Sequence, residues 1–171
     1  MSDVRPLDPE RIMTTLAAHD VRYVLVGALA ARLQGFPRLT ADMDITPSME
    51  PGNLERLARA LRSLDARGFT DGIPEGLPFD CSAETLRNAT MWDLVTDAGR
   101  LDVIFTPAGT DGFADLARTA VDFEVFGILL AAAALEDIVR TKEAADRPQD
   151  RQDVAVIRAM LRKSGPGAGA E

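Results

Sequence analysis

The chain has 171 residues, 46% hydrophobic and 27% charged, which suits one globular domain with its own core. Its net charge of −8 argues against a protein that coats nucleic acid non-specifically, and the lack of a long apolar run argues against a membrane span. The single Cys81 excludes an internal disulfide, and His19, the only histidine, excludes His-rich zinc sites. With no signal peptide visible, we expect a cytoplasmic protein.

Helical periodicity and β-rich runs alternate along the first half of the chain. In order, the pattern predicts a helix at 9–18, a strand at 23–26, a helix at 28–33, a strand at 40–45 and a helix at 53–67. Glycine and proline are frequent in the segment that follows, 68–78, so we expect an irregular surface loop there.

In the second half, two β-prone runs separated by a short turn predict a hairpin. The expected elements are strands at 91–97 and 100–106, a short helix at 112–120, a β-prone run at 123–130, and helices at 135–145 and 149–163. Residues 1–163 are expected to form one domain. The glycine- and alanine-rich end, 164–171, predicts a disordered tail.

Asp42 and Asp44 stand two residues apart in a segment that also contains Met43 and Ile45. Successive side chains of a strand point to opposite faces, so a strand here would hold both carboxylates on one face. Adjacent carboxylates repel each other unless a cation lies between them, and Mg²⁺ binds such oxygens while leaving positions for water and phosphate. The alternative is a solvated pair on an edge strand, although aspartate is disfavoured in strands.

Gly27-Ala28 lies where a predicted strand passes directly into a helix. Such a junction exposes backbone N–H groups and the positive end of the helix dipole, which together can bind an anion. Glycine also lets a phosphate approach the backbone closely. The same junction occurs in many α/β proteins purely for packing, and that interpretation stays open.

Asp102 lies in the otherwise apolar run 100–104. A carboxylate in such a strand is costly to bury without partners. Asp102 therefore lies at the end of a sheet, pairs with Arg100 or Arg38, or belongs to a functional site.

In order and spacing, these segments resemble the polymerase-β-like nucleotidyltransferases. The family pattern is an apolar strand, a glycine at a helix entrance, a D-x-D strand, and a third acid on a later strand. Here these are residues 25–28, 42–45 and Asp102, while residues 38–44 are similar to the R-x-T-x-D-x-D form of small bacterial members. Residues 135–142 and 147–153 are similar to a segment of the AbiEii/AbiGii-like branch, which contains toxins of bacterial toxin–antitoxin and abortive-infection systems.

The resemblance implies an α+β fold with a small mixed β-sheet of the polymerase-β nucleotidyltransferase type, flanked by helices and followed by C-terminal helices. It implies transfer of a nucleoside monophosphate from a nucleoside triphosphate to an acceptor hydroxyl. The residues that would hold two Mg²⁺ or Mn²⁺ ions are Asp42, Asp44 and Asp102, and Asp102 would also take the hydroxyl proton. Those expected at the nucleotide are Gly27, Ala28, Arg38, Lys142 and Asp150.

Several of these roles have alternatives. Lys142 borders the apolar face of its helix and either contacts the triphosphate or extends harmlessly to solvent. Asp150 either supports Lys142, together with Asp153, or caps the start of a helix. Arg38 either meets a phosphate or pairs with an aspartate.

The resemblance leaves the acceptor open between a tRNA end and a protein, and it includes a cognate antitoxin as a partner. An arginine stripe at Arg56, Arg59 and Arg62 either meets an RNA backbone or is a solvated helix face. The chain departs from the family pattern at Ala28, where glycine or serine is usual, so a side-chain donor to the triphosphate is missing. This departure motivates the alternative of a catalytically degenerate nucleotide-binding or interaction module. A metal-dependent phosphohydrolase is a weaker alternative, because such sites usually recruit histidines.

Overall fold

The computed structural model of the chain describes residues 5–165. Its strands are β1 (Tyr23–Val26), β2 (Asp42–Pro47), β3 (Arg67–Thr70), β4 (Ile73–Leu77), β5 (Met91–Thr96), β6 (Gly99–Ile104), β7 (Val121–Val125) and β8 (Ile128–Ala132). Its helices are α1 (Pro9–Ala18), α2 (Gly27–Leu33), α3 (Pro51–Ser63), α4 (Ala83–Arg87), α5 (Phe113–Ala117), α6 (Leu135–Ala145) and α7 (Pro148–Ser164).

All these strands join one mixed sheet in the order β4-β3-β5-β6-β2-β1-β8-β7. β2 runs parallel to β6 and β1 runs parallel to β8, whereas the other neighbouring pairs are antiparallel. The parallel pairing of β2 with β6 brings two distant segments side by side and sets Asp44 opposite Asp102.

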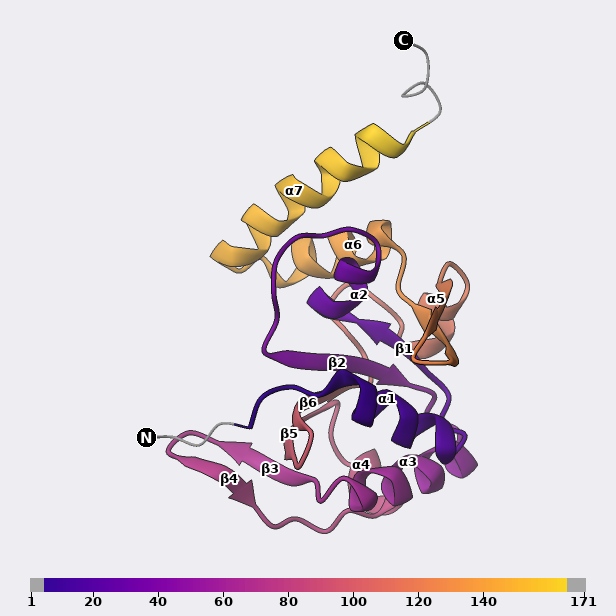
Figure 1. Cartoon of the computed structure of the whole chain (residues 1–171), viewed down its shortest axis with the longest axis vertical. Coiled ribbons are helices and arrows are strands. Elements are labelled where there is room, and N and C mark those ends of the chain that lie inside the picture. Colours follow the sequence, from indigo (N-terminus) through magenta and orange to yellow (C-terminus); the bar gives the residue numbers. More distant parts are fainter. Residues whose placement is uncertain (1–4, 166–171) are drawn as a thin grey trace.

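The two faces of the central sheet differ in their cover. In Figure 1, α1, α3 and α4 lie on one side of β2, whereas α2, α6 and α7 lie on the other. Met43 and Ile45 of β2 are completely buried, as are Leu54, Leu57 and Leu61 along the apolar stripe of α3. Because side chains alternate along a strand, burying Met43 and Ile45 in this core directs Asp42 and Asp44 to the opposite face.

The structure confirms the predicted α+β class, with a mixed sheet, flanking helices and two helices at the C-terminal end. The helix predicted at 53–67 begins earlier and ends earlier, at Pro51–Ser63, and α4 had no predicted counterpart. The predicted tail lies outside the described residues except for Ser164, the last residue of α7, and Gly165. Among the described residues, no helix is long and apolar enough to cross a membrane.

The prediction of an irregular loop at 68–78 was wrong, because β3 and β4 form an antiparallel hairpin there. Gly76 has a φ of +72°, and a Cβ on it would lie 2.8 Å from the carbonyl oxygen of Gly68. Glycine is therefore what lets the two strands approach at this irregular register. Glycine and proline are disfavoured in strands, so the residues that shape this hairpin also made its sequence resemble a loop.

The single β-prone run predicted at 123–130 is two antiparallel strands, β7 and β8. Val125 pairs with Ile128, and the two residues between them, Phe126 and Gly127, have φ of 52° and 74°. A two-residue turn with both φ angles positive usually carries Asn-Gly or Asp-Gly. Phenylalanine in the first position removes that signal, which is why the turn was not predicted.

Candidate active site

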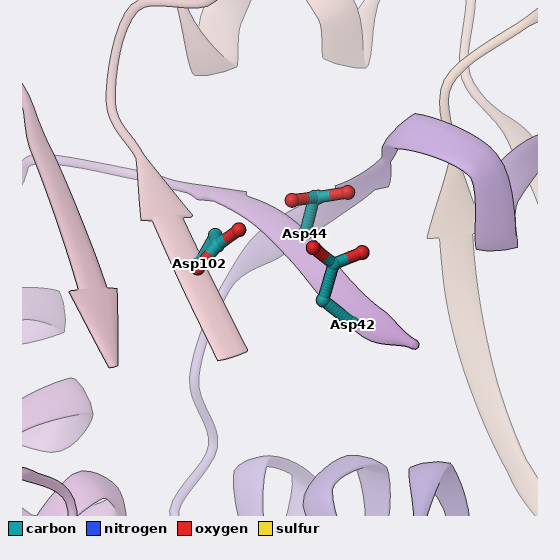
Figure 2. Close-up of side chains that lie close together, drawn as sticks. All are labelled: Asp42, Asp44 and Asp102. Atoms are coloured by element: carbon teal, nitrogen blue, oxygen red, sulfur yellow. The ribbon is translucent and has the colours of Figure 1, made fainter. Parts of the chain in front are cut away.

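Three aspartates from two neighbouring strands meet on the face of the sheet opposite the core. β2 supplies Asp42 and Asp44 at alternate positions, and β6 supplies Asp102 beside Asp44. Each offers a carboxylate oxygen, and these oxygens all lie within 4.8 Å of one another. Figure 2 shows the three side chains directed into the same space. The convergence expected from the sequence is therefore present in the fold.

The electrostatics of this cluster favour a bound cation. Burial raises the pKa of Asp44 to about 8, and the charges of Asp42 and Asp102 add to the effect. Burial also raises the pKa of Asp102 to about 6, with Asp93 on the adjacent strand contributing. Without a counter-charge, the cluster thus retains a proton that an ordinary aspartate would have lost.

The donor set fits a hard divalent cation. All the candidate ligands are carboxylate oxygens, the type that Mg²⁺ and Mn²⁺ prefer, and the described part of the cluster contains no thiol or imidazole. Three carboxylates around one point also leave positions for water and phosphate oxygens. Asp42, Asp44 and Asp102 are therefore the residues that could hold such a metal.

Neighbouring polar groups orient two of the three carboxylates. The Thr40 hydroxyl donates to Asp42 Oδ1 at 2.8 Å. Arg100 Nη2 lies 3.5 Å from Asp102 Oδ1, and its guanidinium stacks 3.6 Å above the ring of Phe69. Asp102 thus pairs with Arg100, one of the alternatives left open by the sequence, while also belonging to the cluster.

Gly27 begins α2 with a φ of +71°, one residue earlier than the helix start predicted from the sequence. A Cβ on this residue would lie 2.2 Å from Asp44 Oδ2. The group that approaches the backbone closely at Gly27 is therefore the carboxylate of Asp44. Any role of Gly27 and Ala28 at a phosphate stays a prediction.

One cleft of about 750 Å³ contains the cluster. Every residue that the sequence analysis placed at the metal or the nucleotide lines it, namely Gly27, Ala28, Arg38, Asp42, Asp44, Asp102, Lys142 and Asp150. Its lining also includes Thr40 and Arg147, which the sequence analysis did not assign to the site. Thr40 could have been found from its position two residues before Asp42, and Arg147 from its position just before Pro148 at a helix start.

Lys142 does not extend to solvent. Its side chain is 11% exposed, and its Nζ lies 2.9 Å from Asp153 Oδ2 and 3.4 Å from Asp150 Oδ1. Asp150 also accepts from the backbone N–H of Arg147 at 3.2 Å, at the start of α7. The two alternatives for Asp150, helix capping and support of Lys142, are thus present together. Arg38 pairs with Asp153 at 3.2 Å.

The arginine stripe of α3 does not line the cleft. Arg56 donates to the backbone oxygen of Asp20, and Arg62 donates to that of Cys81. In Figure 1, α3 lies on the side of β2 away from α2 and α6. Two of the three arginines therefore serve local structure on a different face of the molecule.

Comparison with known proteins shows a similarity of fold between this chain and several solved structures. No model of a known protein family and no curated protein sequence matches the chain. Among solved structures, the lincosamide antibiotic adenylyltransferase LnuA, bound to lincomycin, matches with a TM-score of 0.58 and 12% identity over 91% of this chain and 99% of LnuA. A protein of Thermotoga maritima proposed to be a nucleotidyltransferase matches with a TM-score of 0.50 and 15% identity over 93% of this chain and 97% of its own.

The solution structure of the antibiotic-resistance factor ANT(2'')-Ia also matches, with a TM-score of 0.50 and 17% identity over 91% of this chain and 89% of its own. Of these neighbours, LnuA is an adenylyltransferase and the Thermotoga maritima protein is proposed to be a nucleotidyltransferase. The fold of this chain is thus that of nucleotidyltransferases, and its cleft holds an acidic cluster suited to a divalent metal.

Proposed function

We propose that this protein is a metal-dependent nucleotidyltransferase of the polymerase-β-like superfamily, which moves a nucleoside monophosphate from a nucleoside triphosphate to an acceptor hydroxyl. The observation that carries this proposal is the convergence of Asp42, Asp44 and Asp102 in one cleft with Arg38 and Lys142. Carboxylates for metal ions and cations for phosphates are the two chemistries that the reaction requires. The fold shared with nucleotidyltransferases supports the same conclusion.

In this proposal, Asp42, Asp44 and Asp102 hold Mg²⁺ or Mn²⁺. When bound, the metal supplies positive charge that stabilises the attacking and leaving oxygens of an in-line displacement. The acceptor oxygen forms a bond to the α-phosphorus, the bond from that phosphorus to the bridging oxygen breaks, and pyrophosphate leaves. Asp102 would accept the acceptor proton, and the positive charge of a bound metal would favour the ionised carboxylate that this role requires.

The cations of the cleft would bind the leaving pyrophosphate. Arg38 and Lys142 are both in the lining, and each carries a charge suited to phosphate oxygens. The backbone at Gly27 and Ala28 would contribute N–H donors beside Asp44, and these replace the serine hydroxyl that the chain lacks. Asp150 would act by holding Lys142 in place.

The acceptor would enter from the side of β5 and β6. An in-line displacement sets the attacking oxygen opposite the leaving group, so it lies away from the cations that bind pyrophosphate. The lining in that direction includes Met91, which is 46% exposed, and its cross-strand partner Ile104. Asp93, next to Asp102, is exposed as well. Asp93 stands outside the lining, so the wall itself is apolar at Met91 and Ile104, and the nearest acid to it in the lining is Asp102. Such a wall favours a small, uncharged or cationic hydroxyl compound over a polyanion.

A tRNA end or a protein is the second candidate acceptor, which would make the chain a toxin of the AbiEii/AbiGii-like branch with an antitoxin as partner. The likeness of residues 135–142 and 147–153 to a segment of that branch supports it, whereas the contacts of Lys142 with Asp150 and Asp153 concern the triphosphate whichever acceptor is used. This candidate differs from the first only in the acceptor, so one assay separates them.

The test is a transfer assay with each α-³²P-labelled nucleoside triphosphate, Mg²⁺ or Mn²⁺, and lincomycin, total tRNA or total cell protein as acceptor. We expect label on an acceptor, lost with EDTA and in Asp44→Asn. Asp71→Asn, in the exposed turn between β3 and β4, is the matched control and should transfer normally. Triphosphate binding without transfer to any acceptor would indicate the catalytically degenerate nucleotide-binding module instead. Release of labelled nucleotide without an acceptor would indicate a hydrolase.

A further inference from the structure

Three cations line the cleft, and each comes from a different segment. Arg38 belongs to the irregular connection between α2 and β2, Lys142 to α6, and Arg147 to the position just before α7. Like charges brought this close repel one another unless carboxylates separate them. The carboxylates between them therefore determine the positions of the three cationic side chains.

α7 supplies both separating carboxylates. Asp150 and Asp153 lie three residues apart, hence on one face of the helix, and are 3% and 4% exposed. Asp153 contacts Lys142 at 2.9 Å and Arg38 at 3.2 Å. Asp150 contacts Arg147 at 2.7 Å and Lys142 at 3.4 Å. Two buried carboxylates thus hold three cations, and the group keeps one net positive charge.

Arg38 depends most on this arrangement. It lies outside any helix or strand, and Asp153 is the carboxylate that its guanidinium contacts. Its Nε is buried and has no hydrogen-bond partner among the described residues. A buried donor without an acceptor is costly. The Arg38 side chain as a whole is 36% exposed and lines the cleft, so its guanidinium is available to a phosphate group there.

We propose that Asp153 is a positioning residue, which holds Arg38 and Lys142 together as one binding site for the pyrophosphate portion of a nucleoside triphosphate. The proposal rests on the proposed function, because it concerns the leaving group of that reaction. Stability alone does not require such a network, since apolar side chains of similar volume often replace buried ion pairs without loss. Asp153 therefore acts on the ligand through the two cations, without touching it.

The test uses inorganic pyrophosphate with Mg²⁺, titrated by calorimetry into the full chain and its variants. Asp153→Asn keeps the size of the side chain and removes its charge, and we expect it to weaken pyrophosphate binding about tenfold or more. Binding of Mn²⁺ alone at the aspartate cluster should not change, and KM for the triphosphate should rise more than kcat falls. Asp153→Glu should recover part of the affinity.

Asp146→Asn is the matched control, since Asp146 is 62% exposed, pairs with Arg151 and does not line the cleft. It should bind pyrophosphate like the wild type. If Asp153→Asn does not fold, Arg38→Gln takes its place, because Arg38 is 36% exposed and less needed for packing. Wild-type affinity in the variant tested overturns the inference and leaves the proposed function standing. No pyrophosphate binding by the wild-type chain would remove both.

Discussion

The carboxylate of Asp44 occupies the space that a side chain at residue 27 would need. A Cβ built on Gly27 lies 2.2 Å from Asp44 Oδ2 and 3.0 Å from its Cγ. Gly27 also has a φ of +71°, which other L-residues rarely adopt. The carboxylate of Asp44 can therefore lie where it does only because residue 27, at the start of α2, has no side chain.

Gly27→Ala should therefore damage both stability and activity. The positive φ alone costs about 1–2 kcal/mol of unfolding free energy, and the contact with Asp44 must be relieved in addition. Gly72→Ala is the control, because Gly72 has a φ of +81° but nothing within 4 Å of a built Cβ. Thermal melts should show both variants destabilised, with only Gly27→Ala losing metal binding. Equal metal binding by the two variants would contradict this relationship.

Thr40→Val should weaken metal binding while preserving the fold. The Thr40 hydroxyl donates to Asp42 Oδ1 at 2.8 Å, and valine has the same shape without the donor. Loss of a group that orients a metal ligand typically costs about 10- to 100-fold in affinity or activity. Titration with Mn²⁺ measures the effect. Thr14→Val, which removes a hydroxyl bonded to the backbone oxygens of Glu10 and Arg11 within α1, should leave Mn²⁺ affinity unchanged.

Metal-free stability should fall as pH rises from about 4 to about 8. The folded chain binds protons at Asp44, whose pKa is raised to about 8, and at Asp102, whose pKa is raised to about 6. The unfolded chain has lost those protons above about pH 4, so folding becomes less favourable as they are released. Added Mg²⁺ should raise Tm, and by more at pH 8 than at pH 5. Tm measurements across this range test both statements.

Asp44→Asn should flatten that dependence and abolish the Mg²⁺ effect. Carboxylates whose pKa is lowered do not obscure this pH dependence of stability. In Asp146, for example, hydrogen bonds from Arg151 hold the pKa below its ordinary value, so the contribution of Asp146 to stability changes at a lower pH than the range tested. A metal-free Tm that rises between pH 5 and pH 8 would show that the pKa values of Asp44 and Asp102 are not raised in the folded chain.

Arg100→Gln should move the acidic limb of the pH–activity profile to higher pH. Arg100 lowers the pKa of Asp102, against burial and the charge of Asp93, so its removal makes the carboxyl harder to ionise. Since the proposed mechanism uses ionised Asp102, kcat/KM should begin to rise at a higher pH than in the wild type. Arg118→Gln, on a side chain that is 74% exposed and outside the cleft lining, should leave the profile in place.

The site was more predictable than parts of the sheet around it. Asp42 and Asp44 were placed by strand alternation, which is a local rule. Their meeting with Asp102 depends on the parallel pairing of β2 with β6, and no local pattern encodes that pairing. It was expected only because the order of the motifs resembled a known family.

The misses have physical causes at particular residues. The β3–β4 hairpin depends on the close approach of Gly76 to Gly68, which in sequence resembles a loop. Phe126 at a positive φ hides the turn between β7 and β8. The contact between Gly27 and Asp44 arises from tertiary packing and cannot be seen in the spacing of the residues. The contact of Lys142 with Asp150 and Asp153 was one of the alternatives raised from the sequence, whereas the sharing of Asp153 between Lys142 and Arg38 was not.

Anomalous scattering from crystals soaked with Mn²⁺ and a non-hydrolysable nucleoside triphosphate is the most direct test of the central claim. The account predicts a manganese peak bounded by Asp42, Asp44 and Asp102, with the terminal phosphates beside Arg38 and Lys142. Manganese bound at another place, or a triphosphate bound away from these aspartates, would contradict it.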